Sequence, residues 1–284
     1  MEIINRRARM SSLTRKLRRE NKTIGFVPTM SALHEGHLSL VEEARQMCDI
    51  VIVSIFVNPA QFKEGADFKN YPRDLTADAA LLTEYQVDYI FAPEESEIYG
   101  EGFSTYVYVE NLTETLEGAS RPGHFRGVAT VVTILFNTMR PDYAFFGQKD
   151  AQQVAVIKRL TRDLGFDTEI VVGRTVREES GLAMSSRNAL LSADERRRAS
   201  IIYQALRQAK LAVREGERNA ARLSEIVREK IETEPLARID YVAIVDAETL
   251  EPVDRIAENA VLIAVAARFG GTRLIDNTII NRRP

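Results

Sequence analysis

The chain has 284 residues, of which 45% are hydrophobic and 28% are charged, a composition typical of a soluble globular protein. Its length allows one large domain or two smaller ones. The net charge of −3 offers no general attraction for nucleic acid or an anionic membrane, and the single cysteine, Cys48, excludes an internal disulfide. We therefore expect a cytoplasmic protein that has neither nucleic-acid nor membrane partners.

The first twenty residues are rich in arginine, but they contain no apolar segment of signal-peptide length and no small-residue cleavage site. An amphipathic helix is expected there. A transit peptide is the alternative, although Glu2, Glu20 and the strand pattern that follows at once favour the helix. The longest apolar runs, such as residues 50–57, are too short to span a bilayer.

Strand patterns alternate with helical patterns along the next 150 or so residues. Strands are expected at 23–27, where Pro28 ends the pattern, and at 49–57, 87–92, 143–146 and 168–172. Helices are expected at 38–48, 73–85, 127–139 and 151–164. Residues 103–109 are expected to form an edge strand or a hairpin arm. The alternation predicts an α/β fold with a Rossmann-like, doubly wound parallel sheet.

The pattern changes after residue 176. Two charged helices, at 192–215 and 220–232, precede strands at 239–245, 260–267 and 273–280. The loops between these strands are too short for helical crossovers, so the strands should pair mostly antiparallel. The sequence therefore predicts a Rossmann-like domain over residues 1–176 and a smaller C-terminal α/β domain, containing an antiparallel sheet, over residues 177–284.

The string PTMSALHEGH, residues 28–37, joins the first expected strand to the first helix of the sheet. In an open α/β sheet, ligands bind beyond the carboxyl ends of the strands, where helix N-termini present backbone N–H groups. His34 and His37 at that turn can contact phosphate oxygens and stabilise charge that develops on phosphorus. The alternatives are polar surface or capping histidines, and a zinc site, which the spacing of three disfavours.

A second string, FGQKDAQQ at residues 146–153, also follows a strand and opens a helix. Gly147 permits an unusual backbone angle, and Lys149 is a mobile cation that can reach phosphate. Asp150 is either a plain helix cap or a partner for a ribose or a metal-bound water. The string lacks the glycine spacing of a P-loop, which disfavours a P-loop kinase.

Three further features remain. The loop GLAMSSRN at residues 181–188 offers two hydroxyls and a guanidinium that can clamp phosphates. Gln61, in NPAQF, follows the second buried strand and should face the same crevice. His124, in RPGHFRG, is at least as easily explained as a structural histidine as a ligand.

Together these motifs closely resemble the pantoate–β-alanine ligase (pantothenate synthetase) family, and the likeness extends over nearly the whole chain. The strings PTMSALHEGH, NPAQF, YPRD, RPGHFRGVATVV, FGQKDAQQ and GLAMSSRN occur in the family's order. The resemblance implies that pantoate is activated by Mg-ATP as pantoyl adenylate, with release of pyrophosphate. The β-alanine amine then attacks the acyl carbon and releases AMP. It also implies a cytoplasmic homodimer, with a nucleotide- and pantoate-binding first domain and a C-terminal lid.

The resemblance also implies individual roles. His34, His37, Lys149 and Arg187 are the expected catalytic residues, and His37 is the expected proton donor. Gln61 and Gln153 should hold pantoate, and Gln61 should adjoin β-alanine. The expected ATP contacts are Met30, Ser31, Ala32, Leu33, His34, Glu35, Gly36, His37, Gly147, Gln148, Lys149, Asp150, Val176, Met184, Ser185, Ser186 and Arg187. The metal ligands stay unassigned.

One departure concerns the ATP turn, because the family usually has glycine where this chain has Ser31. Two other functions compete with the ligase. A nucleotidyltransferase acting on a phosphorylated precursor would share the HxGH turn, but it would need more cationic groups and would lack the paired glutamines. A catalytically silent nucleotide-binding or interaction protein would be expected to lack His37, Lys149 or Arg187, and all three are present.

Overall fold

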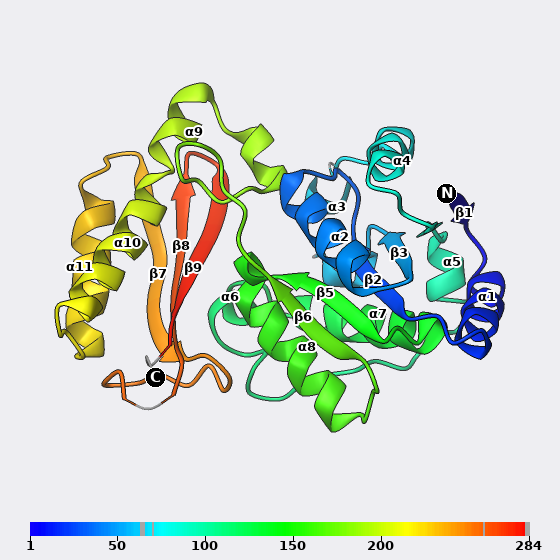
Figure 1. The fold of residues 1–284 in the computed structure, drawn as a ribbon. Coiled ribbons are helices and arrows are strands. Elements are labelled where there is room, and N and C mark those ends of the chain that lie inside the picture. Colours follow the sequence, from blue (N-terminus) through cyan, green and yellow to red (C-terminus); the bar gives the residue numbers. More distant parts are fainter. Residues whose placement is uncertain (63–65, 70, 258, 282–284) are drawn as a thin grey trace. The chain divides into compact units, whose positions relative to one another are not determined.

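The computed structural model describes residues 1–62, 66–69, 71–257 and 259–281, which fold into two compact units (Figure 1). The first unit comprises Met1–Gly147 and Val156–Gly173, and the second comprises Gln148–Ala155 and Arg174–Pro284. The short segment Gln148–Ala155 thus belongs to the second unit although it lies between two parts of the first.

The first unit contains a six-stranded sheet whose order is β1-β4-β3-β2-β5-β6, and each pair of neighbours is parallel. The strands are β1 (Glu2–Ile4), β2 (Ile24–Thr29), β3 (Ile50–Ile55), β4 (Tyr89–Phe91), β5 (Tyr143–Gly147) and β6 (Glu169–Gly173). From β2 the order runs through β3 and β4 on one side and through β5 and β6 on the other, which is the doubly wound arrangement, and β1 is added at the edge beside β4. The predicted fold class is confirmed.

Helices connect these strands. They are α1 (Arg7–Arg19), α2 (Glu35–Met47), α3 (Ala66–Lys69), α4 (Leu75–Glu84), α5 (Glu95–Ile98), α6 (Leu116–Ser120), α7 (His124–Met139) and α8 (Ala151–Asp163). The predicted N-terminal helix is confirmed as α1, which buries Met10, Thr14 and Leu17 on one face. That stripe, at spacings of four and three residues, packs α1 against α7.

Strand β2 is covered on both faces. Val27 packs with Leu38, Val41 and Ala44 of α2 in one buried cluster. Phe26, the neighbouring residue, points to the opposite face, where its ring meets Phe136 of α7 edge-on at 6.3 Å. Burial on both faces explains why the strand patterns are nearly continuous apolar runs.

The second unit contains a three-stranded antiparallel sheet of β7 (Ala237–Asp246), β8 (Val261–Phe269) and β9 (Thr272–Ile280). The helices α10 (Ile201–Arg214) and α11 (Ala220–Glu232) pack against it (Figure 1). Their buried residues share one apolar cluster with β8, which includes Leu206, Leu223 and Ile263. The predicted antiparallel pairing is confirmed.

The prediction that Pro28 ends its strand is wrong, because β2 continues to Thr29. The backbone N–H of Ile24 donates to the Asp142 carboxylate, and the Asp142 N–H donates to the Ile24 carbonyl. The backbone N–H and C=O groups of every second residue of β2, and so the nitrogen of Pro28, therefore point towards β5. Pairing between β2 and β5 stops at Phe26. The missing N–H of Pro28 therefore costs no bond of the ladder.

Two other expected elements need correction. Residues 103–109 form no strand. Their aromatic side chains instead pack among themselves and against Arg126, whose guanidinium lies 3.8 Å above the Tyr106 ring. The single helix expected at 192–215 is two helices, α9 (Ala193–Arg198) and α10, because Ser200 interrupts it by donating its hydroxyl to the Arg197 carbonyl at 2.8 Å.

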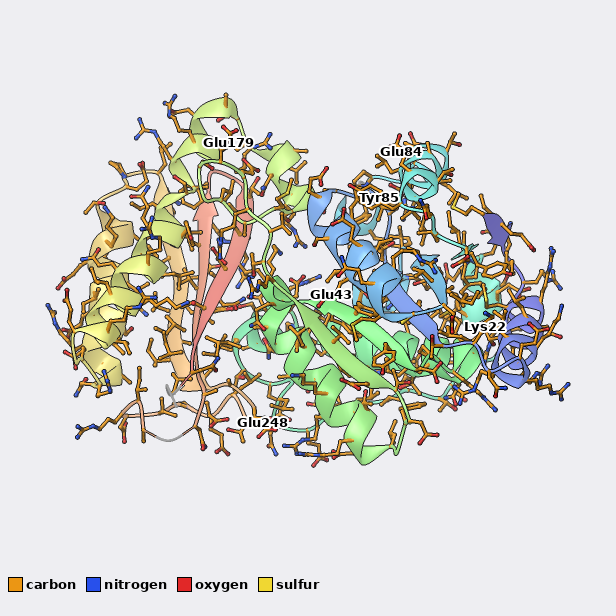
Figure 2. All side chains as sticks on the ribbon, in the orientation of Figure 1. Lys22, Glu43, Glu84, Tyr85, Glu179 and Glu248 are labelled. Atoms are coloured by element: carbon orange, nitrogen blue, oxygen red, sulfur yellow. The ribbon has the colours of Figure 1, made fainter. Side chains whose placement is uncertain are left out.

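Many charged side chains lie on the outside of both units. Lys22, Glu84, Glu179 and Glu248, labelled in Figure 2, are all exposed. Among the described residues, no helix is both long enough and apolar enough to cross a membrane.

Candidate active site

The loop 30–34 and the first turn of α2 lie at the carboxyl end of β2, at the centre of the six-stranded sheet. Helix α2 begins at Glu35, three residues before the predicted start at Leu38, and His34 is its N-cap residue. The Nδ1 atom of His34 accepts the backbone N–H of Gly36 at 3.1 Å. His37 completes the capping box, because its Nδ1 accepts the backbone N–H of His34 at 3.4 Å.

These two bonds determine which ring nitrogen of each neutral histidine carries the proton. A ring nitrogen that accepts a hydrogen bond carries no proton, so each neutral imidazole holds its proton on Nε2. The two rings are 4.1 Å apart between centroids and are tilted by 33°. Two Nε2–H donors are thereby held side by side at a helix N-terminus, where the helix dipole also favours an anion.

Gln61 lies in the 3₁₀ turn η1 (Pro59–Gln61), which follows β3. Its side chain is 8% exposed, and its Oε1 accepts from the Asn58 amide at 3.0 Å. Its Nε2 donates to the sulfur of Met30 at 2.8 Å. The structure therefore brings Gln61 and Met30, predicted from separate motifs, into direct contact.

The backbone of η1 is also held in place. Gly127 of α7 lies so close to it that an added Cβ would meet the Ala60 carbonyl oxygen at 2.2 Å. The Gln61 carbonyl accepts from Nδ1 of His124 at 2.9 Å. His124 is thus a structural residue that fixes the turn carrying Gln61, one of the two interpretations that the sequence left open.

Asn58 and Tyr99 extend this network away from Gln61. Tyr99 donates its hydroxyl to Oδ1 of Asn58 at 2.6 Å. Burial raises the pKa of the Tyr99 hydroxyl, so it stays protonated and remains a donor at any ordinary pH. Asn58 in turn donates to Gln61 and to the Gly127 carbonyl, which orients the Gln61 amide.

In the second unit, the 3₁₀ turn η2 (Gln148–Asp150) precedes α8 and is held by Asn277 of β9. Nδ2 of Asn277 donates to the carbonyls of Gln148 and Lys149 at 3.0 and 2.9 Å. The Lys149 side chain is only 18% exposed, and its ammonium lies 3.4 Å from an Asp150 carboxylate oxygen. Gln153 lies on the first turn of α8 and is half-buried.

The remaining predicted residues lie on one loop of the second unit. Val176 accepts the backbone N–H of Met184 at 3.0 Å, so these two predicted ATP contacts are paired. Ser185 caps the turn η3 (Ser186–Leu190), because its Oγ accepts the backbone N–H of Arg187 at 3.2 Å. Ser185, Ser186 and Arg187 thus form one ordered turn.

This loop is anchored by a largely buried ion pair that the sequence did not indicate. Arg177 binds both carboxylate oxygens of Asp276, at 2.6 and 2.9 Å, and it also donates to the Gly181 carbonyl at 3.1 Å. The Arg177 guanidinium stacks over the Tyr203 ring at 4.0 Å. A bidentate, stacked arginine fixes the start of the loop 177–187 in one orientation.

The motifs contain the predicted site residues but not all of the residues that support them. Asn58 and Gly127 lie within the recognised strings, and a glycine early in an apolar helix is a signal for close backbone approach. Asn277 and Asp276 carry no local signal, because their partners are about a hundred residues away or more.

Among the described residues, no group of three or more histidine, cysteine, aspartate or glutamate side chains is placed to hold a metal ion. Cys48, at the C-terminal end of α2, is 8% exposed, and burial raises its pKa to about 11. Its thiol is therefore protonated at neutral pH and shielded from a substrate, which makes it a poor nucleophile.

Comparison with known proteins shows which family this chain resembles. The family described as pantoate–β-alanine ligase matches residues 2–279. A pantothenate synthetase from Heliobacterium modesticaldum is 54% identical to this chain over 280 residues, which cover 99% of each chain.

Solved structures give the same result. A pantothenate synthetase from Thermus thermophilus matches with a TM-score of 0.92 and 46% identity, over 99% of this chain and 100% of that one. A pantoate–β-alanine ligase from Francisella tularensis, complexed with beta-gamma ATP and β-alanine, matches with a TM-score of 0.80 and 36% identity, over 98% of this chain and 97% of that one.

Proposed function

Because the chain belongs to the pantoate–β-alanine ligase family, whose members form pantothenate with ATP, we propose how its own residues carry out that reaction. The first step is an adenylation. A pantoate carboxylate oxygen bonds to the α-phosphorus of ATP, and the bond from that phosphorus to the bridging oxygen breaks, releasing pyrophosphate. In the second step the β-alanine amine attacks the acyl carbon. The acyl C–O bond breaks, AMP leaves and the amine loses a proton.

His34 and His37 act in the first step. The observation that carries this assignment is the shared capping geometry, in which both Nδ1 atoms are occupied by backbone N–H groups of the α2 N-terminus. Each imidazole then offers Nε2–H as a donor to phosphate oxygens, and His37 is the proton donor. Donors fixed before the substrate arrives stabilise developing charge without reorganising.

Lys149 and Arg187 supply the cations for the ATP phosphates. The Lys149 ammonium is largely buried beside a half-exposed carboxylate, which is weak compensation for its charge and favours an added anion. Mg²⁺ enters with ATP as part of the substrate. Such an ion usually keeps several waters and contacts the protein through one or two carboxylates. The Asp150 side chain is 48% exposed and is suited to contact a metal-bound water.

Gln61 and Gln153 bind pantoate, and Gln61 also adjoins β-alanine. An amide offers both donor and acceptor atoms, which suits a substrate that carries hydroxyls and a carboxylate. Held by Asn58 and Met30, the Gln61 amide has a fixed orientation, so little entropy is lost when pantoate binds.

The family resemblance supplies the rest of the proposal. Residues 1–176 carry the nucleotide- and pantoate-binding role, including the segment Gln148–Ala155 that packs with the second unit, and residues 177–284 form the lid. The enzyme works as a homodimer in the cytoplasm, and the single cysteine suits that reducing compartment.

The pantoate assignment predicts that Gln61→Ala raises the KM for pantoate by about tenfold or more, because a polar substrate group then loses its buried partner. The KM for ATP should change much less. Steady-state kinetics with each substrate varied in turn measures both constants.

Gln204→Ala is the matched control, because Gln204 is an exposed glutamine on α10. That variant should leave both KM values as they are. If Gln61→Ala raised both KM values equally, the residue would support the fold of the site and not pantoate binding.

A further inference from the structure

Two consecutive residues just before the histidine turn have left-handed backbone conformations. Ser31 has a φ of 93° and Ala32 has a φ of 54°, and neither is a glycine. Residues with a Cβ rarely adopt this region because the side chain crowds the backbone. Such a conformation persists only where neighbouring groups hold it, and it is common at functional sites.

One carboxylate holds both of these residues. Oδ2 of Asp78 accepts the Ser31 hydroxyl at 2.6 Å and the Ala32 N–H at 3.1 Å. Oδ1 of the same side chain accepts the Leu33 N–H at 2.9 Å. These three bonds reach three successive residues, and the next residue along the chain is the N-cap His34.

Asp78 is itself firmly placed. It lies in the first turn of α4, where the helix dipole favours a carboxylate, and it is 3% exposed. Asp74 caps the same helix, and its backbone N–H donates to the Ser31 hydroxyl at 3.3 Å. The loop 31–33 is therefore tied to the start of α4 by both its hydroxyl and its backbone.

We propose that Asp78 is a positioning residue for the adenylation step. Its carboxylate holds residues 31–33 in place, including the left-handed pair Ser31 and Ala32, and that loop conformation sets where His34 and His37 present their Nε2 atoms. The inference rests on the proposed role of the two histidines. Asp78 is 3% exposed and both of its carboxylate oxygens accept hydrogen bonds from the loop, so we assign it an effect through the loop and no direct contact with the substrates.

The test is Asp78→Asn, which keeps the side-chain size. An amide has one acceptor oxygen, so at least one of the two loop N–H groups would face its NH₂ donor. We expect kcat to fall by about tenfold to 10²-fold, since misplacing a catalytic group by about 1 Å has an effect of that size. The KM for pantoate should change by less than about threefold, because a misplaced histidine weakens contacts made in the transition state and leaves the contacts that bind ground-state pantoate intact.

Asp246→Asn is the matched control, because Asp246 is also buried and its Oδ1 accepts two backbone N–H groups, from Glu248 and Thr249 at 2.8 and 2.9 Å. It serves a turn in the antiparallel unit. This variant should lower the melting temperature while kcat stays at the wild-type value. An equal fall of kcat in both variants would mean that Asp78 matters only for general stability.

Ser31→Gly separates positioning from packing. Glycine adopts a φ of 93° without the Cβ penalty, so the double variant Asp78→Asn/Ser31→Gly should recover about fivefold of the lost kcat, the factor that corresponds to roughly 1 kcal/mol of relieved strain. No recovery in the double variant, or wild-type kcat in Asp78→Asn alone, would overturn the proposal.

If Asp78→Asn does not fold, Ser31→Ala and Ser31→Gly test the same claim, because both lose the hydroxyl bond and only glycine relieves the backbone. Ser31→Gly should then be the more active, and equal activities would overturn the proposal.

His37→Ala separates this proposal from the one on which it rests. If His37→Ala is impaired but Asp78→Asn is not, only the positioning role fails; if His37→Ala is also normal, the role of the histidine turn fails.

Discussion

Replacing His37 with alanine is expected to lower turnover by roughly 10²-fold or more, the scale measured when one oriented transition-state donor is removed. The side chain is half-buried at the start of α2 and is not part of the apolar core of the unit. Its loss removes one bond of the capping box, so the fold should survive. Rapid-quench or steady-state rates, with circular dichroism as a check on folding, measure the two effects.

Two further variants divide the roles of the two ring nitrogens. His37→Asn keeps an acceptor near the position of Nδ1 and can still cap the helix, whereas His37→Gln keeps a donor near Nε2. If Nε2–H acts on ATP, His37→Asn should be stable but as slow as the alanine variant, and His37→Gln should retain more activity. A fast His37→Asn enzyme would reduce the residue to a helix cap.

Lys149→Met is expected to lower kcat/KM for ATP by roughly 10²-fold, again the scale for losing one oriented charge at the reacting phosphates. Methionine keeps most of the apolar stem, so the 18% exposed site stays filled while the ammonium is lost. Removing a partly buried cation should not destabilise the fold, because its nearest carboxylate, Asp150, is half-exposed and can be solvated.

Lys158→Met is the matched control, since Lys158 is an exposed lysine on the same helix that Lys149 precedes. Its kinetic constants should equal those of the wild type. A normal kcat/KM for ATP in Lys149→Met would assign the lysine to solubility or local packing and leave the phosphates to Arg187.

Much of the fold could be predicted because hydrophobic periodicity is a local property. The buried run of β3 and the closing antiparallel strands are each evident from a few residues. Strand β1 has three residues, of which only Ile4 is buried, so no hydrophobic period in the sequence predicts it. The prediction that Pro28 ends β2 is wrong because a strand tolerates proline where its neighbour has stopped pairing. Where β5 stops pairing with β2 is a property of the tertiary structure, and the local sequence does not show it.

The candidate site likewise contains residues that the local sequence predicts and residues that only tertiary contacts reveal. His34, His37 and Gln61 stand out because they follow strands of a predicted parallel sheet. Asp78 could not be found in this manner, since it acts on a loop 45 to 47 residues earlier in the chain. The predicted site residues gather in short strings, whereas supporting residues such as Asp78 and Asn277 come from distant parts of the chain and leave no local pattern.

The central claim is that pantoate is activated as an adenylate before β-alanine reacts. Cys48 is a poor nucleophile, because it is 8% exposed and burial raises the pKa of its thiol, so the structure does not favour a phosphorylated thiol as an intermediate. The histidines instead offer donors to phosphate, which suits direct attack by the substrate carboxylate.

Exchange of labelled pyrophosphate into ATP tests this claim most directly. If the adenylate forms first, exchange should occur with pantoate and Mg-ATP in the absence of β-alanine, because pyrophosphate can leave and return. Omitting pantoate should abolish it, and adding β-alanine should divert the intermediate to pantothenate and AMP. Exchange that proceeds without pantoate, or release of ADP and phosphate in place of AMP and pyrophosphate, would contradict the account.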